Sequence, residues 1–131
     1  MLTHEEAAAR VAKGAAYLDE VCPVWVEHVE VNTLDMADSC RCVLGQLHGY
    51  YRDACELLFA TPRVLGLSWP GRMQAAFDAA AALGFDAPVS RVRAETATDF
   101  ALLQDAWVEL IAARRIPDPQ PADPVWALVE V

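Results

Sequence analysis

The first apolar pattern in the chain recurs at spacings of three and four residues, which is the period of an amphipathic helix. It predicts a helix over residues 4–21. Thr3-His4-Glu5-Glu6 has the form of a capping box at its start, and Pro23 ends it because proline cannot continue a helix. Gly14 lies off the apolar stripe. The inward positions are Ala8, Val11, Ala15, Leu18 and Cys22.

A second apolar stripe predicts one continuous helix over residues 40–58, capped by Asp38 or Ser39. Gly45 and Gly49 lie four residues apart within it, and each costs about 1 kcal/mol relative to alanine in a helix. We therefore expect the two glycines to permit close approach of another backbone. The stripe consists of Cys40, Val43, Leu44, Leu47, Tyr51, Ala54, Cys55 and Leu58.

Two further helices are predicted downstream. Ser68 and Pro70 have the capping residue and early proline of a helix start, and Gly84 supplies the left-handed residue that ends helices, with Phe85 as the apolar contact of a Schellman motif. The last helix starts near Thr96 or Thr98 and runs to about Arg115. Its inward positions are Phe100, Leu103, Trp107, Leu110 and Ile111.

The pattern between residues 23 and 36 is less regular. Its valines suit a strand by propensity, yet they break strict alternation. We favour a short helix beginning at Pro23, with Trp25 and Val29 on one side. The loop that follows is expected to place Leu34 and Met36 in the core.

These elements predict an all-α fold, a compact bundle of four to five helices with an extended Pro-rich tail. Residues 1–116 form the single helical domain. Residues 117–131 form a Pro-rich strap and an apolar terminus, because four closely spaced prolines cannot continue a helix. The expected core is Val11, Leu18, Trp25, Leu34, Val43, Leu44, Leu47, Leu58, Phe77, Phe85, Leu103, Trp107 and Leu110.

Charge and composition narrow the function classes. The net charge of −9, from 19 acidic and 10 basic residues, repels phosphate backbones, so nucleic-acid binding is disfavoured. No apolar run reaches the ~20 residues of a membrane-spanning helix, and no signal-peptide pattern is present. We therefore expect a cytoplasmic protein with reduced cysteines. Arg114 and Arg115 suit the negative end of a helix dipole, on a solvated face.

The chain resembles a group of small uncharacterised proteins of actinobacteria and actinobacteriophages. The resemblance rests on Pro23-x-Trp25, on Thr33-Leu34-Asp35, and on the motif Cys42-Val43-Leu44-Gly45-Gln46, followed by the pairs Gly84-Phe85 and Ala106-Trp107. It covers about residues 1–115. It implies an origin in a phage or phage-like element, and it implies no particular activity.

The cysteines suggest two kinds of chemistry, and we favour neither. Cys40 and Cys42, with His48 nearby, are weak candidates for a zinc site, because strong zinc signals put two or more residues between paired cysteines. A thiol in a first helical turn can be reactive, but Cys42 and His48 would lie roughly 9 Å apart along one helix. We expect no catalytic residue, no metal and no cofactor, and treat the thiols as apolar packing.

An apolar terminus behind a stiff strap must dock somewhere. We single out Trp126, Leu128 and Val129 as interaction residues, and favour docking on the same domain or a second copy over recognition of another protein. A further alternative is that the acidic residues between Asp19 and Asp38 form a patch for a basic partner.

The sequence therefore favours a non-enzymatic protein that acts by protein–protein interaction with a host protein or with itself. The alternative is a structural-zinc or thiol-based regulatory protein. A small enzyme is a third hypothesis, for which no catalytic set can be named.

Overall fold

The computed structural model describes residues 2–59, 68–88 and 93–115. Within those ranges the chain is helical and has no strand, which confirms the predicted all-α class. The tail from residue 117 onward, and with it Trp126, Leu128 and Val129, lies outside the described residues. The elements are α1 (His4–Val21), α2 (Trp25–His28), a 3-10 helix (Val31–Thr33), α3 (Val43–His48), α4 (Tyr51–Leu58), α5 (Trp69–Ala82) and α6 (Arg93–Arg115).

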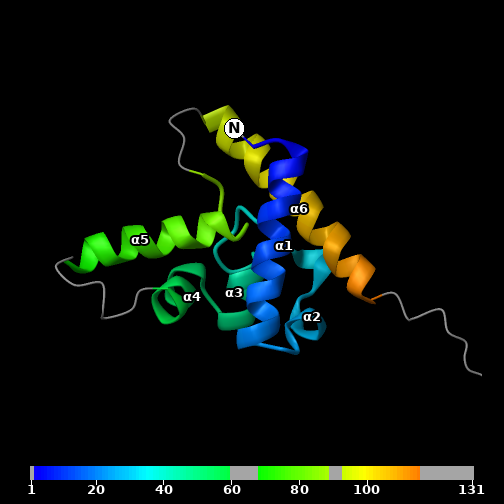
Figure 1. Ribbon diagram of the computed structural model, residues 1–131, viewed down its shortest axis with the longest axis horizontal. Helices are drawn as coiled ribbons and strands as arrows, with labels where there is room; N and C mark the ends of the chain where they lie inside the picture. Colours follow the sequence, from blue (N-terminus) through cyan, green and yellow to red (C-terminus); the bar gives the residue numbers. More distant parts are fainter. Residues whose placement is uncertain (1, 60–67, 89–92, 116–131) are drawn as a thin grey trace, which may run out of the picture.

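α1 and α6 lie side by side and run in the same direction (Figure 1). At their N-terminal ends the Leu2 backbone N–H donates to Asp99 Oδ1 at 2.7 Å. At their C-terminal ends Arg114 pairs with Asp19 at 2.9 Å. These contacts at both ends fix the register of the two helices.

The start of α1 follows the predicted capping box. The Glu6 backbone N–H donates to Thr3 Oγ1 at 3.1 Å, and the Thr3 backbone N–H donates to Glu6 Oε1 at 2.9 Å. Two amide donors that the first helical turn leaves without partners are thereby satisfied. α2 and the buried positions of Trp25, Val29 and Leu34 also agree with the prediction for residues 23–36.

α5 ends in the predicted Schellman motif. Gly84 has φ +78°, the Phe85 N–H donates to the Ala80 carbonyl at 2.9 Å, and the Gly84 N–H donates to the Ala81 carbonyl at 3.1 Å. A Cβ atom on Gly84 would lie 2.9 Å from the Val11 nitrogen. The end of α5 therefore contacts the backbone of α1 directly, at the centre of the molecule (Figure 1).

Gly14, on α1, also allows the end of α5 to lie close to the backbone of α1. A Cβ atom at this position would lie 2.0 Å from the Leu83 carbonyl oxygen and 3.1 Å from the Trp107 ring. Gly14 is buried although it lies off the apolar stripe. Gly14 thus allows the contact between α1 and the end of α5.

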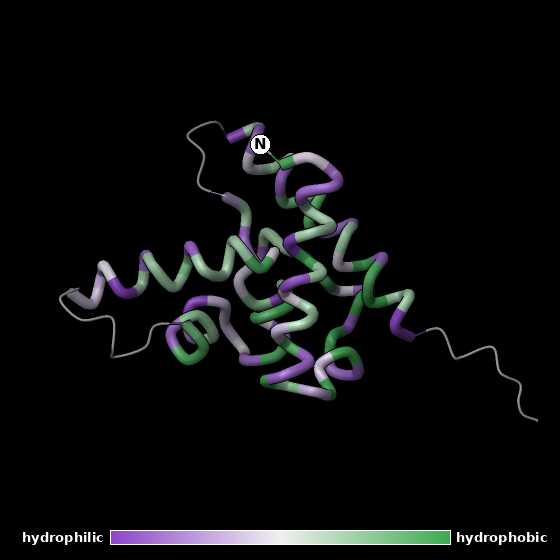
Figure 2. The backbone as a smooth tube through the Cα atoms, viewed as in Figure 1, coloured by the Kyte–Doolittle hydropathy of each residue, from purple (hydrophilic) through white to green (hydrophobic). Residues whose placement is uncertain are grey.

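Three aromatic rings form the centre of the core, and Figure 2 shows hydrophobic and hydrophilic positions alternating along the helices that surround it. Trp107 meets Trp25 edge to face, with ring centroids 5.7 Å apart, and stacks on Phe85 at 5.4 Å. Its indole N–H donates to the Gly84 carbonyl at 2.6 Å. Trp25 and Trp107 are fully buried. Four residues expected in the core are only half-buried around it, namely Leu47, Leu58, Phe77 and Leu110.

The single helix predicted over residues 40–58 is wrong. α3 ends at Gly49, which has φ +93°, and α4 starts afresh at Tyr51. A Cβ on Gly45 would lie 2.2 Å from the Ser39 carbonyl oxygen, and the Tyr51 N–H donates to that oxygen at 2.8 Å. The expected close approach at Gly45 is real, but Gly49 ends a helix instead of packing inside one.

The boundaries of the last helix also differ from the prediction. α6 begins at Arg93, before Thr96 and Thr98. The Thr98 hydroxyl donates to the Ala94 carbonyl at 2.9 Å, so this threonine bonds within the helix instead of capping it. No helix in the described ranges is both long enough and apolar enough to cross a membrane.

Candidate functional site

A cavity of about 140 Å³ lies where the loop before α3, the start of α4 and the residues after α5 meet. Its buried walls include Met36, Cys42 and Phe85, whereas Ala37 and Ser39 are exposed at its edge. Four further residues complete the lining, namely Asp38, Tyr51, Asp86 and Phe100.

A hydrogen bond between Tyr51 and Asp86 crosses one side of this cavity. The Tyr51 hydroxyl donates to Asp86 Oδ2 at 2.6 Å, and the Ala87 backbone N–H donates to Asp86 Oδ1 at 2.8 Å. The Tyr51 ring also stacks on Phe77, with centroids 5.8 Å apart. Tyr51 thus connects α4, α5 and the segment after α5.

Burial shifts the ionisation of Cys42, Cys55, Tyr51 and Asp86 toward the neutral form. It raises the pKa of the Cys42 thiol to about 11 and that of the Cys55 thiol to about 11. The pKa of Asp86 is raised by burial, and hydrogen bonds from Tyr51 and Ala87 offset this only in part. The pKa of Tyr51 is raised by burial and by Asp86. Both thiols are therefore protonated near neutral pH.

The predicted cysteine candidates do not converge. Cys40 is exposed in the loop before α3, Cys42 is buried as the N-cap of α3, and His48 is exposed at the other end of that helix. The Cys42 sulfur accepts a hydrogen bond from the Gly45 N–H at 3.3 Å. In the described part of the chain, no three His, Cys, Asp or Glu side chains are grouped so as to hold a metal ion.

The hypothesis of a reactive Cys42 thiolate is contradicted by its environment. A helix N-terminus lowers a thiol pKa when the sulfur is partly solvated, but Cys42 is only 2% exposed. α3 has just six residues, and desolvation outweighs the hydrogen bonds that the sulfur accepts. Cys42 therefore caps and packs a helix, which agrees with the interpretation of the thiols as apolar packing, but Cys40, which the same interpretation placed on the apolar stripe, is exposed.

These environments predict an order of thiol reactivity. With iodoacetamide at pH 7.5, we expect Cys40 to be alkylated rapidly in the folded protein. Cys42 and Cys55 should react more slowly by a factor of about 100 or more, because both are buried and less than one thiol in a thousand ionises near neutral pH when the pKa is about 11. Peptide mass spectrometry after timed quenching measures the rates.

A denatured sample provides the control for alkylation, because all four cysteines should then react at similar rates. Rapid modification of Cys42 in the folded protein would contradict its placement in the core.

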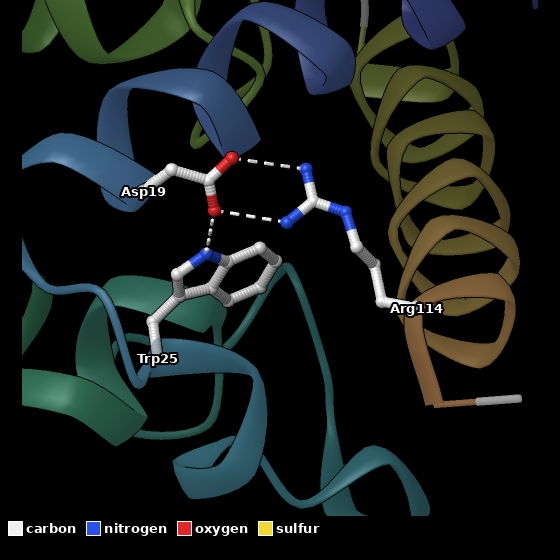
Figure 3. Close-up of polar contacts among 3 residues, drawn as sticks. All are labelled: Asp19, Trp25 and Arg114. Carbon is white, nitrogen blue, oxygen red and sulfur yellow. Dashed lines mark hydrogen bonds and ion pairs between the residues drawn. The ribbon is translucent and has the colours of Figure 1, made fainter. Parts of the chain in front are cut away.

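A polar clamp joins the C-terminal ends of α1 and α6 to α2 (Figure 3). Asp19 accepts two hydrogen bonds from the Arg114 guanidinium, at 2.9 and 3.1 Å, and a third from the Trp25 indole N–H at 2.9 Å. The hydrogen bonds from Arg114 and Trp25 lower the pKa of Asp19. Asp19 is therefore already engaged within the chain, which weakens the alternative of a partner-binding acidic patch that includes it.

Arg115 extends the clamp by donating to the backbone carbonyls of Val26 and Val29. The position of Arg114 and Arg115 at a helix end predicts a solvated face for both. Both side chains are exposed, yet both make specific contacts far away in the sequence. Adjacent arginines at a helix end gave no signal of these partners, since the partners are an aspartate and two carbonyls more than eighty residues earlier.

A second concave feature lies along the outer side of the α1 and α6 pair, with a volume of about 410 Å³. Its lining combines apolar and acidic side chains, namely His4, Glu5, Ala8, Leu102, Asp105, Ala106 and Glu109. None of its three carboxylates makes a hydrogen bond or ion pair with the described residues. We refer to this feature as the acidic groove.

The two helices that form the acidic groove, α1 and α6, are held against each other by polar contacts at both ends. Asp99, which is fully buried, holds Leu2 at one end, and its second oxygen, Oδ2, has no hydrogen-bond partner among the described residues. The clamp of Asp19 with Arg114 holds the other end. Sequence reasoning missed the groove, because its acidic residues come from helices about one hundred residues apart.

Comparisons with known proteins identify no relative. No protein-family model matches the chain, and neither the curated proteins nor the solved structures include a significant match.

Proposed function

We propose that this chain is a non-enzymatic, phage-type cytoplasmic protein that acts by binding a protein of its host. The acidic groove between α1 and α6 carries the proposal. It combines an apolar lining from Ala8, Leu102 and Ala106 with carboxylates that have no partner in the described residues. The partner best suited to this lining is a basic amphipathic segment, with an apolar side for the groove and lysines or arginines for its rim.

The charge of the chain supports a heterologous partner over self-association through this groove. The chain has a net charge of −9, and a second copy docked groove to groove would place its own carboxylates against Glu5, Asp105 and Glu109. Like charges brought together at an interface suppress association. A basic segment would instead be attracted to the groove, and its association would be faster at low ionic strength.

Binding of a model peptide tests this proposal. The probe is a fluorescein-labelled helical peptide with leucines on one face and lysines on the other, and the comparison peptide has glutamate in place of each lysine. Fluorescence anisotropy should show binding of the lysine peptide, weakening as salt rises from low to physiological concentration. The glutamate peptide should not bind.

Two charge-matched double variants locate the site. Asp105→Asn with Glu109→Gln should weaken binding by about tenfold, since each rim carboxylate contributes up to about 1 kcal/mol. Glu27→Gln with Glu56→Gln changes the net charge equally at exposed positions away from the groove, and should weaken binding by less than about twofold. Asp105 and Glu109 are four residues apart on α6, so removing their repulsion does not destabilise the helix. Equal losses in the two variants would contradict the assignment to the groove.

A further inference from the structure

The cavity beside Tyr51 and Asp86 is separate from the acidic groove, and its lining has a distinct chemical character. Three aromatic residues line it, namely Tyr51, Phe85 and Phe100, together with Met36. Its volume of about 140 Å³ is close to that of a cavity of about 150 Å³ that accepts a benzene-sized molecule. The space therefore suits one small group.

Two carboxylates also line this cavity. Asp38 uses Oδ1 to accept the N–H groups of Cys40 and Arg41, at 2.8 and 3.2 Å, and its Oδ2 has no hydrogen bond within the described part of the chain. Asp86 accepts from Tyr51 and Ala87. Because a carboxylate offers about four acceptor sites, both groups retain free lone pairs.

We infer that this cavity binds an alkylammonium group, held by the aromatic rings and by the carboxylates of Asp38 and Asp86. Aromatic faces attract cations through their quadrupole, and rings arranged around a small space recognise quaternary and methylated ammonium groups. A neutral ligand would contact the aromatic rings but would leave the negative charges of the two carboxylates without a cationic partner. The inference does not depend on the function proposed for the acidic groove.

The surroundings of Asp86 agree with the binding of an alkylammonium group in this cavity. No ion pair joins Asp86 to a described lysine or arginine, and burial raises its pKa. Asp86 is half-buried, and a carboxylate partly removed from water without a cationic partner is costly, so a bound cation would offset part of that cost. A hard metal ion fits less well, since Ca²⁺ takes six to eight oxygen ligands and this lining offers only two carboxylates, those of Asp38 and Asp86.

Choline and its neutral carbon isostere, 3,3-dimethylbutan-1-ol, are the probes for this inference. They have nearly the same shape and differ in the positive charge. Titration of the ¹⁵N-labelled full chain, followed by ¹H–¹⁵N spectra, should show shifts at the amides of residues 36–42 and 85–87. Choline should bind at least about tenfold more tightly than the isostere, because desolvated cation–aromatic contacts supply about 2 kcal/mol.

Three variants test the named groups. Phe100→Leu keeps an apolar wall and removes the ring, and Asp86→Asn and Asp38→Asn each remove a charge. Each should weaken choline binding about fivefold or more, and the two Asp→Asn variants should leave binding of the isostere unaffected. Asp78→Asn is the control, since Asp78 is an exposed carboxylate of α5 that does not line this cavity. Melting curves identify any variant that does not fold. The choline affinities of the variants that do fold then test whether the named groups bind the cation.

Peptides distinguish whether the alkylammonium group belongs to a side chain of a protein or to a free small molecule. If trimethyllysine within a short peptide binds at the same amides while its norleucine counterpart does not, the cavity accepts a side chain of a protein. Binding of choline without the peptide assigns the site to a free small molecule. Equal affinities for choline and its isostere, or full choline binding in all three cavity variants, would overturn the inference.

Discussion

Substitution of Trp107 by alanine is expected to lower the free energy of unfolding by about 4 kcal/mol, at the upper end of the range for large-to-small core changes. The ring is fully buried between Trp25 and Phe85. Its removal leaves a cavity and also leaves the Gly84 carbonyl without its indole donor. Since small domains are stable by only 5–15 kcal/mol, much of the protein should be unfolded in mild denaturant. Urea titration followed by circular dichroism measures the change.

Trp107→Phe separates the two contributions. Phenylalanine retains a ring against Phe85 but donates no hydrogen bond to Gly84, so the expected cost is about 2 kcal/mol, that of a buried acceptor left unsatisfied plus a small volume loss. A cost below about 1 kcal/mol for Trp107→Ala would contradict the central position of this side chain.

Gly14→Ala is expected to destabilise the protein by about 3 kcal/mol, at the upper end for an overpacked core. Helix propensity alone gives the opposite sign, because alanine is favoured over glycine by about 1 kcal/mol within a helix. The added methyl group would lie 2.0 Å from the Leu83 carbonyl oxygen, and α1 and α5 would have to separate. The sign of the change in melting temperature therefore distinguishes packing from propensity.

Lys13→Ala is the matched control for Gly14→Ala, because Lys13 is the exposed neighbour on the same helix. It should change the stability by less than about 0.5 kcal/mol. If Gly14→Ala raised the melting temperature, the direct contact between α1 and the end of α5 would be ruled out.

Local signals in the sequence predicted the start of α1 and the end of α5 correctly, but not the start of α6 or the ends of α3. The capping box at Thr3 and the Schellman motif at Gly84 each depend on residues within one turn, and both form as expected. The break at Gly49 was missed because apolar spacing continues through it. A glycine that closes one helix and a glycine that packs within a longer helix are identical in such a pattern.

The functional features were harder to predict because they depend on tertiary contacts. The cavity joins Asp38, Tyr51 and Asp86 from three separate segments, and the acidic groove joins Glu5 with Asp105 and Glu109. Periodicity assigns each of these residues to an element but does not indicate which elements become neighbours. The apolar spacing placed Cys40, and not Cys42, on the inward stripe, whereas the structure has Cys42 buried and Cys40 exposed. The spacing failed here because α3 begins only at Val43, and the pairing of Cys42 with the Gly45 amide depends on the loop geometry.

The most direct test of the proposed binding surface is chemical-shift mapping with the lysine-rich amphipathic peptide on the ¹⁵N-labelled chain. We expect the largest shifts at residues 4–8 of α1 and 102–109 of α6, the two stretches that line the acidic groove. Shifts confined to α2, α3 and α4, or the same shifts with the glutamate peptide, would contradict the proposal that this groove receives a basic partner.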